Sequence, residues 1–596
     1  MNTPEKNFLK ARKPKRELSP SEECEECIPL VDIEKIQNFF DFTDKFFQAN
    51  LAKLTAGISP AAVQMDFFSW LAQLAQSPGH LLELASFPAI HFSDCVNKLV
   101  CEEELGEIKD DVRFHSESWQ YMPWRLWAEG FLQVENWWHL ATTHVQGVPS
   151  HAERSVSFFA RQFLDALSPS NFVLTNPDLF YETLRSGGYN LVRGTELAVE
   201  HTLRRFTGAP PPGADKFIPG KHVAITPGRI VFKNHLIELI QYEPQTKTVY
   251  KEPILIIPAW IMKYYILDLS PDNSLVKWLV KKGHTVFMIS WRNPTSEDRD
   301  MGMDEYYRLG AMAAIDKISE IFPKEKINLM GYCLGGTLAM ITASAMASNN
   351  DDRLNSLTLL AAQADFTEAG ELMIFISESE VSFLKNMMWD QGYLDTKQMA
   401  GAFQVLRPYD LIWSKMVQDY MHGRRRGMID LLAWNADTTR MPYKMHSEYL
   451  EKLFLNNDFA KGRFTIEDQH VVAENIQMPT FAVSTEKDHV APWQSVYKIH
   501  LMINGDITFV LTNGGHNAGI VSEPGHKGRY YRIYERKKGQ SYINPQMWLD
   551  VAEKHDGSWW YSLHNWLVDH SPSKRVSAPS LDSSLPAAPG EYVMQK

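Results

Sequence analysis

A cysteine between glycines is the residue of this chain best placed to act as a nucleophile. Residues 331–336 read GYCLGG, directly after the apolar run 327–330 and before a helix-like stretch that begins near residue 337. This order predicts a strand, a sharp turn and a helix, the arrangement that exposes the nucleophile of G-x-S-x-G enzymes. The helix N-terminus favours a thiolate at Cys333. The alternative is a structural cysteine buried in a tight turn.

An acid and a histidine follow later strands in the order that such enzymes use. Asp488 comes after the strand-like run 480–484, and His516 lies in the sequence GGHNAG after the run 507–512. The carboxyl ends of parallel strands meet at one edge of a sheet, so Cys333, Asp488 and His516 are expected to lie together. His489 and His526 are rival bases, but His489 is next to the acid and His526 lies further along a loop.

An oxyanion site and a preference for thioesters follow from the nucleophile. The peptide N–H of Leu334 is one predicted oxyanion donor, and the second is expected from the loop after the run 254–257, at Trp260 or Ile261. An acyl group on sulfur is a thioester, so its exchange with another thioester is nearly thermoneutral. A free thiol has a pKa of about 8.5, so it needs a neighbouring base near neutrality.

The overall composition is that of a globular protein and excludes several classes. The 596 residues carry a net charge of −12 and are 44% apolar, which argues against general nucleic-acid binding. No stretch has the length and apolarity of a membrane span, and the basic N-terminal stretch lacks the apolar region of a secretory signal. Five cysteines make no disulfide framework, and the lone Cys24–x–x–Cys27 pair does not complete a zinc site. We therefore expect a reducing cytoplasm, no metal and no cofactor.

The periodicity of the chain predicts an α/β fold with two additions. Residues 1–30 are expected to form a disordered tail, 31–215 a helical N-terminal domain, 216–570 the catalytic domain and 571–596 an extended tail. In the catalytic domain, β-rich runs alternate with helix-length segments, which predicts a mostly parallel sheet with helices on both faces. The interval 361–478 is too long for a loop, so we expect a helical cap insertion there.

An aromatic stripe occurs in the helical N-terminal region. Trp124, Trp127, Phe131, Val134 and Trp138 recur at steps of three and four residues, which marks one face of a helix. Such a stripe usually belongs to a core, and that is our prediction. The alternative is a surface for a partner or an apolar particle.

From about residue 110 onward the chain resembles a known family, the long-chain, single-subunit polyhydroxyalkanoate synthases of class I. The resemblance rests on the triad and on several further blocks. These blocks are 168–172 (SPSNF), 175–177 (TNP), 258–269 (PAWIMKYYILDL), 283–287 (GHTVF), 290–294 (SWRNP), 406–413 (LRPYDLIW), 434–437 (WNAD), 557–560 (GSWW) and 587–593 (AAPGEYV). Ala259 and Met262 depart from residues common in the family, which bears on substrate preference and not on the triad.

The resemblance implies an α/β-hydrolase fold and a polymerisation reaction. His516 takes the proton of Cys333, which attacks an (R)-3-hydroxyacyl-CoA, and successive acyl transfers extend a polyester. Asp488 either orients His516 or activates the 3-hydroxyl. The resemblance also implies a homodimer in the cytoplasm at the surface of polyester granules. Two alternatives remain: a thioesterase or polyester depolymerase of the same fold, and a granule protein without activity.

The sequence does not single out the residues that bind the CoA phosphates. Arg407 and the run 424–426, which is three arginines, are candidates by charge alone. A solvated loop and a structural ion pair explain these residues equally well.

Overall fold

The computed structural model describes residues 33–55, 57–100, 108, 110–395, 398, 412–571 and 575–596. The predicted tail 1–30, the Cys24/Cys27 pair and Arg407 lie outside the described residues. Within the described parts, no helix is both long and apolar enough to cross a membrane.

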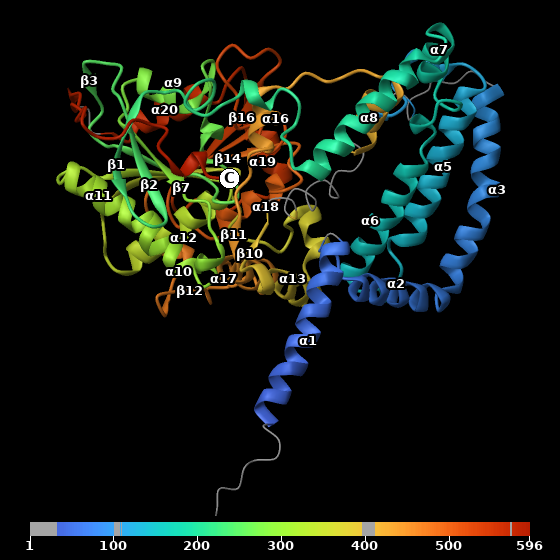
Figure 1. Ribbon diagram of the computed structural model, residues 1–596, viewed down its shortest axis with the longest axis horizontal. Helices are drawn as coiled ribbons and strands as arrows, with labels where there is room; N and C mark the ends of the chain where they lie inside the picture. Colours follow the sequence, from blue (N-terminus) through green and yellow to red (C-terminus); the bar gives the residue numbers. More distant parts are fainter. Residues whose placement is uncertain are drawn as a thin grey trace, which may run out of the picture.

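A ten-stranded sheet forms the centre of the catalytic region (Figure 1). The order of its strands is β1-β2-β7-β4-β8-β9-β14-β15-β16-β17. The run from β7 to β15 is parallel, and antiparallel pairs close both edges. The strands are β1 (Gly228–Lys233), β2 (Ile237–Tyr242), β4 (Ile254–Ile257), β7 (Val286–Trp291), β8 (Ile327–Tyr332), β9 (Leu354–Leu360), β14 (Thr480–Thr485), β15 (Ile507–Thr512), β16 (Tyr530–Arg536) and β17 (Glu553–Asp556). The predicted α/β class with a mostly parallel sheet is confirmed.

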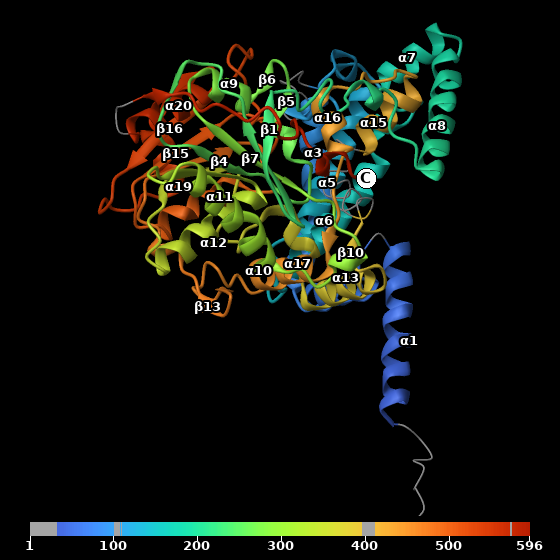
Figure 2. The same ribbon diagram turned by 60° about the vertical axis from the view of Figure 1, so that its left-hand side comes forward.

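Helices cover both faces of the sheet, which explains why its central strands are almost entirely buried and mostly apolar. Ile254 and Ile256 of β4 contribute to one buried cluster, and Leu255 and Ile257 contribute to the other. Helices α9 (Leu275–Lys281) and α20 (Trp560–Asp569) pack in the first cluster, while α11 (Ala313–Ile321) and α12 (Leu334–Ser348) pack in the second (Figure 2). The alternation of side chains along β4 therefore supplies both layers of the core.

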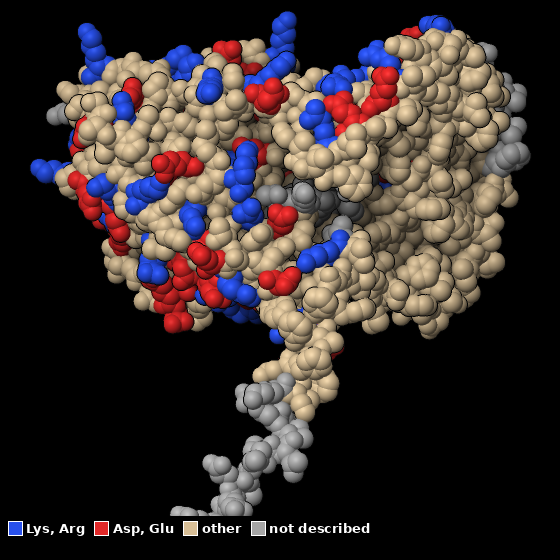
Figure 3. Space-filling view, in the orientation of Figure 1, with Lys and Arg blue, Asp and Glu red and all other residues tan. Residues whose placement is uncertain are grey.

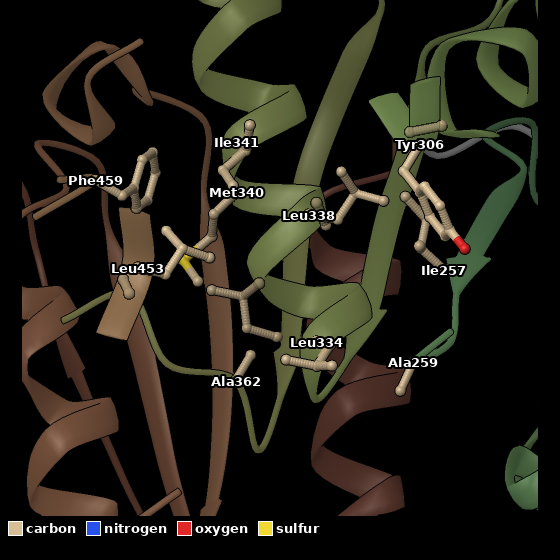
Figure 4. Packing of buried hydrophobic residues seen from close by; sticks show 14 of the residues in the cluster. Ile257, Ala259, Tyr306, Leu334, Leu338, Met340, Ile341, Ala362, Leu453 and Phe459 are labelled. Carbon is tan, nitrogen blue, oxygen red and sulfur yellow. The ribbon is translucent and has the colours of Figure 1, made fainter. Parts of the chain in front are cut away.

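The interval between β9 and β14 holds several short elements instead of a single crossover. Among its described residues, the α-helices are α13 (Glu378–Gln391), α15 (Ser414–Met416), α16 (Asp430–Asn435) and α17 (Tyr443–Glu448). Two segments are π-helical, η9 (Val417–Met421) and η10 (Tyr449–Leu455). Two small antiparallel pairs, β10 (Tyr393–Leu394) with β11 (Met441–Pro442) and β12 (Thr465–Ile466) with β13 (Gln469–His470), were not predicted. Figure 4 shows Leu453 and Phe459 of this interval in the same core as Met340 of α12.

The N-terminal region is a set of helices beside the sheet (Figure 1). They are α1 (Ile33–Leu54), α2 (Pro60–Ala75), α3 (Pro78–Val100), α5 (Trp124–Thr142), α6 (Ser150–Leu167), α7 (Pro177–Arg185) and α8 (Tyr189–Thr207). Several of these helices contact the interval between β9 and β14: α1 packs on α13, and α8 packs on η9. Further contacts join α6 to η7 (Gly370–Phe375) and α2 to α13, so the N-terminal helices and this interval touch at several places.

The aromatic stripe of α5 is only partly core, which corrects the prediction. Trp124 is buried, and Phe131 and Trp138 pack against small buried clusters. Trp127 and Val134, however, are 53% and 46% exposed. The helix spans two small clusters whose contacts leave the middle of the stripe uncovered, so its periodicity alone overstated its burial.

The segment 575–596 runs extended along the sheet edge that β1 forms. Ala587 pairs with Arg229 of β1, and β18 (Val576–Ser577) pairs with β3 (Thr248–Val249). Val593 is 1% exposed, and the peptide N–H groups of Glu591 and Tyr592 donate to the buried Glu238 carboxylate. These contacts fix the segment in place on the catalytic region.

Candidate active site

Cys333 occupies a strained turn between β8 and α12. Its backbone has φ 53° and ψ −122°, outside the regions that residues with a side chain ordinarily adopt. Its peptide N–H donates to the Leu360 carbonyl of the adjacent β9 at 2.8 Å. Strain held by such surroundings is typical of a nucleophile raised above the end of a sheet.

Three glycines make this turn possible because no side chain would fit beside it. A Cβ at Gly335 would lie 2.1 Å from the carbonyl oxygen of Ile257, at the end of β4. A Cβ at Gly331 would lie 2.4 Å from the Gly336 Cα, and one at Gly336 would lie 2.4 Å from the Ala362 Cβ. The start of α12 is therefore packed directly against the ends of β4, β8 and β9.

The structure brings His516 and Asp488 together from two loops. His516 Nδ1 lies 2.8 Å from Asp488 Oδ2, and the His516 and Asp488 side chains are 14% and 0% exposed. Asp488 accepts three further hydrogen bonds: from the Thr485 hydroxyl at 3.0 Å and from the peptide N–H groups of Val490 and Ala491 at 3.0 and 2.8 Å. Both oxygens of the carboxylate are thus occupied.

The electrostatics of the pair follow from burial and opposite charge. Burial acts to lower the pKa of His516, but the Asp488 carboxylate and the Cys333 sulfur outweigh it and raise that pKa well above its ordinary value. Burial likewise acts to raise the pKa of Asp488, whereas His516 and the hydrogen bonds from Ala491 and Thr485 lower it below its ordinary value. His516 is therefore placed between a fixed anion and a sulfur that can hold negative charge.

The two rival histidines lie away from this arrangement. His489 is exposed, although it is next to Asp488 in the sequence. His526 is 2.8 Å from Glu523, with its side chain 41% exposed. Of the three candidates, only His516 has its ring beside both the Cys333 sulfur and Asp488.

The loop after β4 lies beside the start of α12, as expected for an oxyanion site. Its carbonyls are fixed by Thr439: the Thr439 hydroxyl donates to the Trp260 carbonyl at 2.6 Å, and its peptide N–H donates to the Ile261 carbonyl at 3.2 Å. Among the described residues, no acceptor is found for the peptide N–H groups of Leu334, Trp260 and Ile261. These groups are the available donors near Cys333, and their role stays a prediction.

Two residues that hold the site were not identified from the sequence. Thr485 ends β14, and a polar residue at the end of a buried strand is a weak signal that could have indicated it. Thr439 lies far along the chain from the loop that it holds, within the inserted interval, and no local pattern marks it. Its contact arises only because this interval folds back over the loop after β4.

Arginines considered for the CoA phosphates are already paired within the protein. Arg424 donates to Glu182 of α7 at 2.8 Å, and Arg425 is paired with Glu200 of α8. Arg426 contacts Ser414 at 2.9 Å. The structural explanation of this run is therefore favoured. In the described ranges, no group of three or more His, Cys, Asp or Glu residues is arranged to hold a metal ion.

Fold and site together define a protein of the α/β-hydrolase fold with a cysteine in the strained strand-to-helix turn. Models of known families match in three places: the alpha/beta hydrolase fold over residues 252–523, the poly-beta-hydroxybutyrate polymerase (PhaC) N-terminus over 110–279 and the poly-beta-hydroxybutyrate polymerase N terminal over 38–80. A poly(3-hydroxyalkanoate) polymerase of Methylorubrum extorquens is 40% identical over 82% of this chain and 81% of its own length. The chain belongs to the poly(3-hydroxyalkanoate) polymerase family, which confirms the resemblance.

Other relatives match over a similar length. The poly(3-hydroxyalkanoate) polymerase subunit PhaC of Rhizobium meliloti (strain 1021) is 36% identical over 83% of this chain and 81% of its own length. The subunit of the same name from Cupriavidus necator is 32% identical over 82% of this chain and 83% of its own length. These matches include both the N-terminal helices and the catalytic region.

Proposed function

We propose that this protein polymerises (R)-3-hydroxyacyl-CoA into a polyester with release of CoA, and that Cys333 carries the acyl group. The observation that carries the proposal is the strained Cys333 turn beside the His516–Asp488 pair, in a chain of the poly(3-hydroxyalkanoate) polymerase family. The relatives named as polymerases support the reaction class.

Each acylation begins when His516 takes the proton of the Cys333 thiol. The thiolate attacks the thioester carbonyl, and the negative charge that develops on the carbonyl oxygen is stabilised by the N–H group of Leu334 and one from Trp260 or Ile261. The bond to CoA sulfur breaks, and His516 returns the proton to the CoA thiolate. A hydroxyl group then attacks the acyl-Cys333 carbonyl, with its proton passing to His516, and a new ester forms as the Cys333 sulfur leaves.

Within this mechanism, we assign Asp488 the role of orienting His516. The carboxylate is fully buried, and four hydrogen bonds occupy its two oxygens. A substrate hydroxyl could reach it only after several of these bonds had broken. Orientation of the imidazole, with stabilisation of its protonated form, requires no such rearrangement.

Replacing the carboxylate tests this role through the pH dependence of the reaction. In Asp488→Asn, we expect CoA release to fall by about 10³-fold or more, because the amide no longer fixes the imidazole tautomer. The acid limb of log(kcat/KM) should also move to lower pH. Asp488 raises the pKa of His516, so without this carboxylate the imidazolium loses its proton at lower pH. An acid limb that stays in place or moves upward would contradict the orienting role.

The reaction itself is tested with a single substrate. Given 3-hydroxybutyryl-CoA, the protein should release free CoA while the solution becomes turbid with insoluble polyester. Release of CoA with only soluble hydroxy acid would favour the thioesterase or depolymerase alternative. Absence of CoA release would favour a granule protein without activity. The same assay with eight- to ten-carbon substrates measures the preferred monomer length.

We further propose that the N-terminal helices bind the surface of the polyester. Large apolar side chains lie exposed on several of them; they include Phe40, Phe47, Met65, Phe68, Leu82, Ile90, Trp127 and Leu203. The right-hand part of Figure 3, where Figure 1 places α2, α3 and α5, is almost bare of charged side chains below its upper rim. An uncharged apolar face fits a water-insoluble polymer, and it supports the proposed association with polyester granules.

Charges placed on this face should weaken granule binding. In Phe68→Lys and Leu82→Lys, whose side chains are 64% and 71% exposed, we expect the fraction that sediments with washed polyester particles to fall several-fold. Leu501→Lys is the matched control, since Leu501 is 60% exposed in the catalytic region. Equal losses in all three variants would contradict a dedicated face. Sedimentation of the free protein would also test the homodimer that we propose from the family resemblance.

A further inference from the structure

The residues next to the catalytic cysteine and histidine are joined by a hydrogen bond. Tyr332 precedes Cys333 and ends β8, and Asn517 follows His516. The Tyr332 hydroxyl donates to Asn517 Oδ1 at 2.6 Å. Tyr332 is 2% exposed, and burial raises its pKa well above the ordinary value, so the hydroxyl remains a donor at any working pH.

This bond spans a gap that the sheet leaves open. The order β8-β9-β14-β15 puts two strands between the one that leads to Cys333 and the one that leads to His516. At about 4.8 Å per strand, the ends of β8 and β15 are separated by about 14 Å. Backbone pairing within the sheet therefore cannot set the distance from sulfur to imidazole, and contacts between the two loops must do so.

Asn517 is suited to transmit this constraint to the histidine loop. Its carbonyl accepts the peptide N–H groups of Ile520 and Val521 at 3.1 and 2.9 Å, so it starts the turn that follows His516. The Asp488 bond holds only one edge of the imidazole, which could still swing about that contact. The centroids of the Tyr332 and His516 rings lie 5.8 Å apart, so the Tyr332 ring limits such a swing.

The same asparagine also reaches the inserted interval between β9 and β14. Its Nδ2 donates to Asn435 Oδ1 at 3.4 Å, at the end of α16. The preceding Trp434 donates through its indole N–H to the carbonyl of Lys263 at 2.7 Å, in the loop that carries Trp260 and Ile261. The segment 434–439 thus contacts both the oxyanion loop and the histidine loop.

We propose that the Tyr332–Asn517 hydrogen bond is a brace that sets the position of His516 relative to Cys333, and that both are positioning residues for acyl transfer. The inference rests on the proposed roles of Cys333 and His516. The brace acts on the geometry of the pair and not on substrate binding, so it affects kcat and the reactivity of the thiol more than KM.

The test uses Tyr332→Phe, which removes only the hydroxyl, Asn517→Leu, which removes the acceptor at similar volume, and the double variant. We expect each single variant to lower kcat about tenfold or more, with KM changed less than twofold. The rate of iodoacetamide alkylation at Cys333 is measured across a range of pH by mass spectrometry of the Cys333 peptide. We expect this pH profile to shift to higher pH, because the thiolate loses the well-placed His516 imidazole. The kcat of the double variant should lie within about threefold of the kcat of the less active single variant.

Tyr531→Phe is the matched control, because the Tyr531 hydroxyl bonds Ser562 at 2.7 Å, and Ser562 belongs to neither loop. It should leave both readouts unchanged. Unchanged kcat and alkylation profiles in both single variants would overturn the brace, and so would a double variant whose loss equals the product of the single losses. Alkylation needs no substrate, so it tests the brace even if the wild-type protein released no CoA and the proposed function failed.

Discussion

Cys333→Ala is expected to reduce CoA release from 3-hydroxybutyryl-CoA to background, a loss of at least about 10⁴-fold. The turn that presents the sulfur is preserved by its glycines and by the Cys333 N–H bond to Leu360, none of which involves the side chain. Alanine removes the sulfur that we propose as the acyl acceptor, so the remaining site can bind substrate but cannot form a covalent intermediate at residue 333.

A serine variant tests the role of sulfur separately from the need for a nucleophile at this position. Cys333→Ser keeps a nucleophile at the same position but would store the acyl group as an oxygen ester. Release of CoA should then fall strongly, while slow acylation remains detectable. Cys95→Ala serves as the control cysteine and should keep full activity. Full activity in Cys333→Ala, with the same thermal stability as the wild-type protein, would exclude Cys333 as the nucleophile.

The second large effect is expected from the histidine. His516→Gln should lower CoA release by at least about 10³-fold, because His516 alone of the three candidate histidines lies beside Cys333 and can take and return the proton. His489→Gln should stay within about twofold of wild type, since His489 is exposed and its ring is not part of the pair. Both variants are assayed for CoA release under the same conditions. The reverse ranking of the two would make His489 the base and would require the Asp488 loop to rearrange.

Much of the sheet could be predicted because its central strands are short, mostly apolar runs. The runs 254–257 and 327–332 are bounded by turn residues, and β4 and β8 have these same limits. The last two strands, β16 and the edge strand β17, were not predicted because they carry many charged residues and are mostly not buried, so no periodic pattern marks them. Trp127 and Val134 show the opposite error, in which a correct helix periodicity is read as burial.

The members of the candidate triad could be predicted from local motifs, but the residues that support them could not. Cys333, Asp488 and His516 each follow a strand within a few residues, and parallel strands bring such positions together. The brace joins Tyr332 and Asn517, which are 185 positions apart. Both lie inside the glycine-flanked motifs of Cys333 and His516, but these motifs do not indicate that the two side chains meet. Such contacts depend on the path of the inserted interval and of two loops, which a single sequence does not specify.

Detection of the acyl group on the protein is the most direct test of the mechanism. The wild-type protein is mixed with 3-hydroxybutyryl-CoA, quenched in acid within the first turnovers and digested, and the peptide that contains Cys333 is weighed by mass spectrometry. We expect this peptide to gain the mass of one or more 3-hydroxybutyryl units, and hydroxylamine, which cleaves thioesters, to remove the added mass. An unmodified Cys333 peptide in an actively polymerising sample, with the acyl mass on another residue, would contradict the proposed nucleophile.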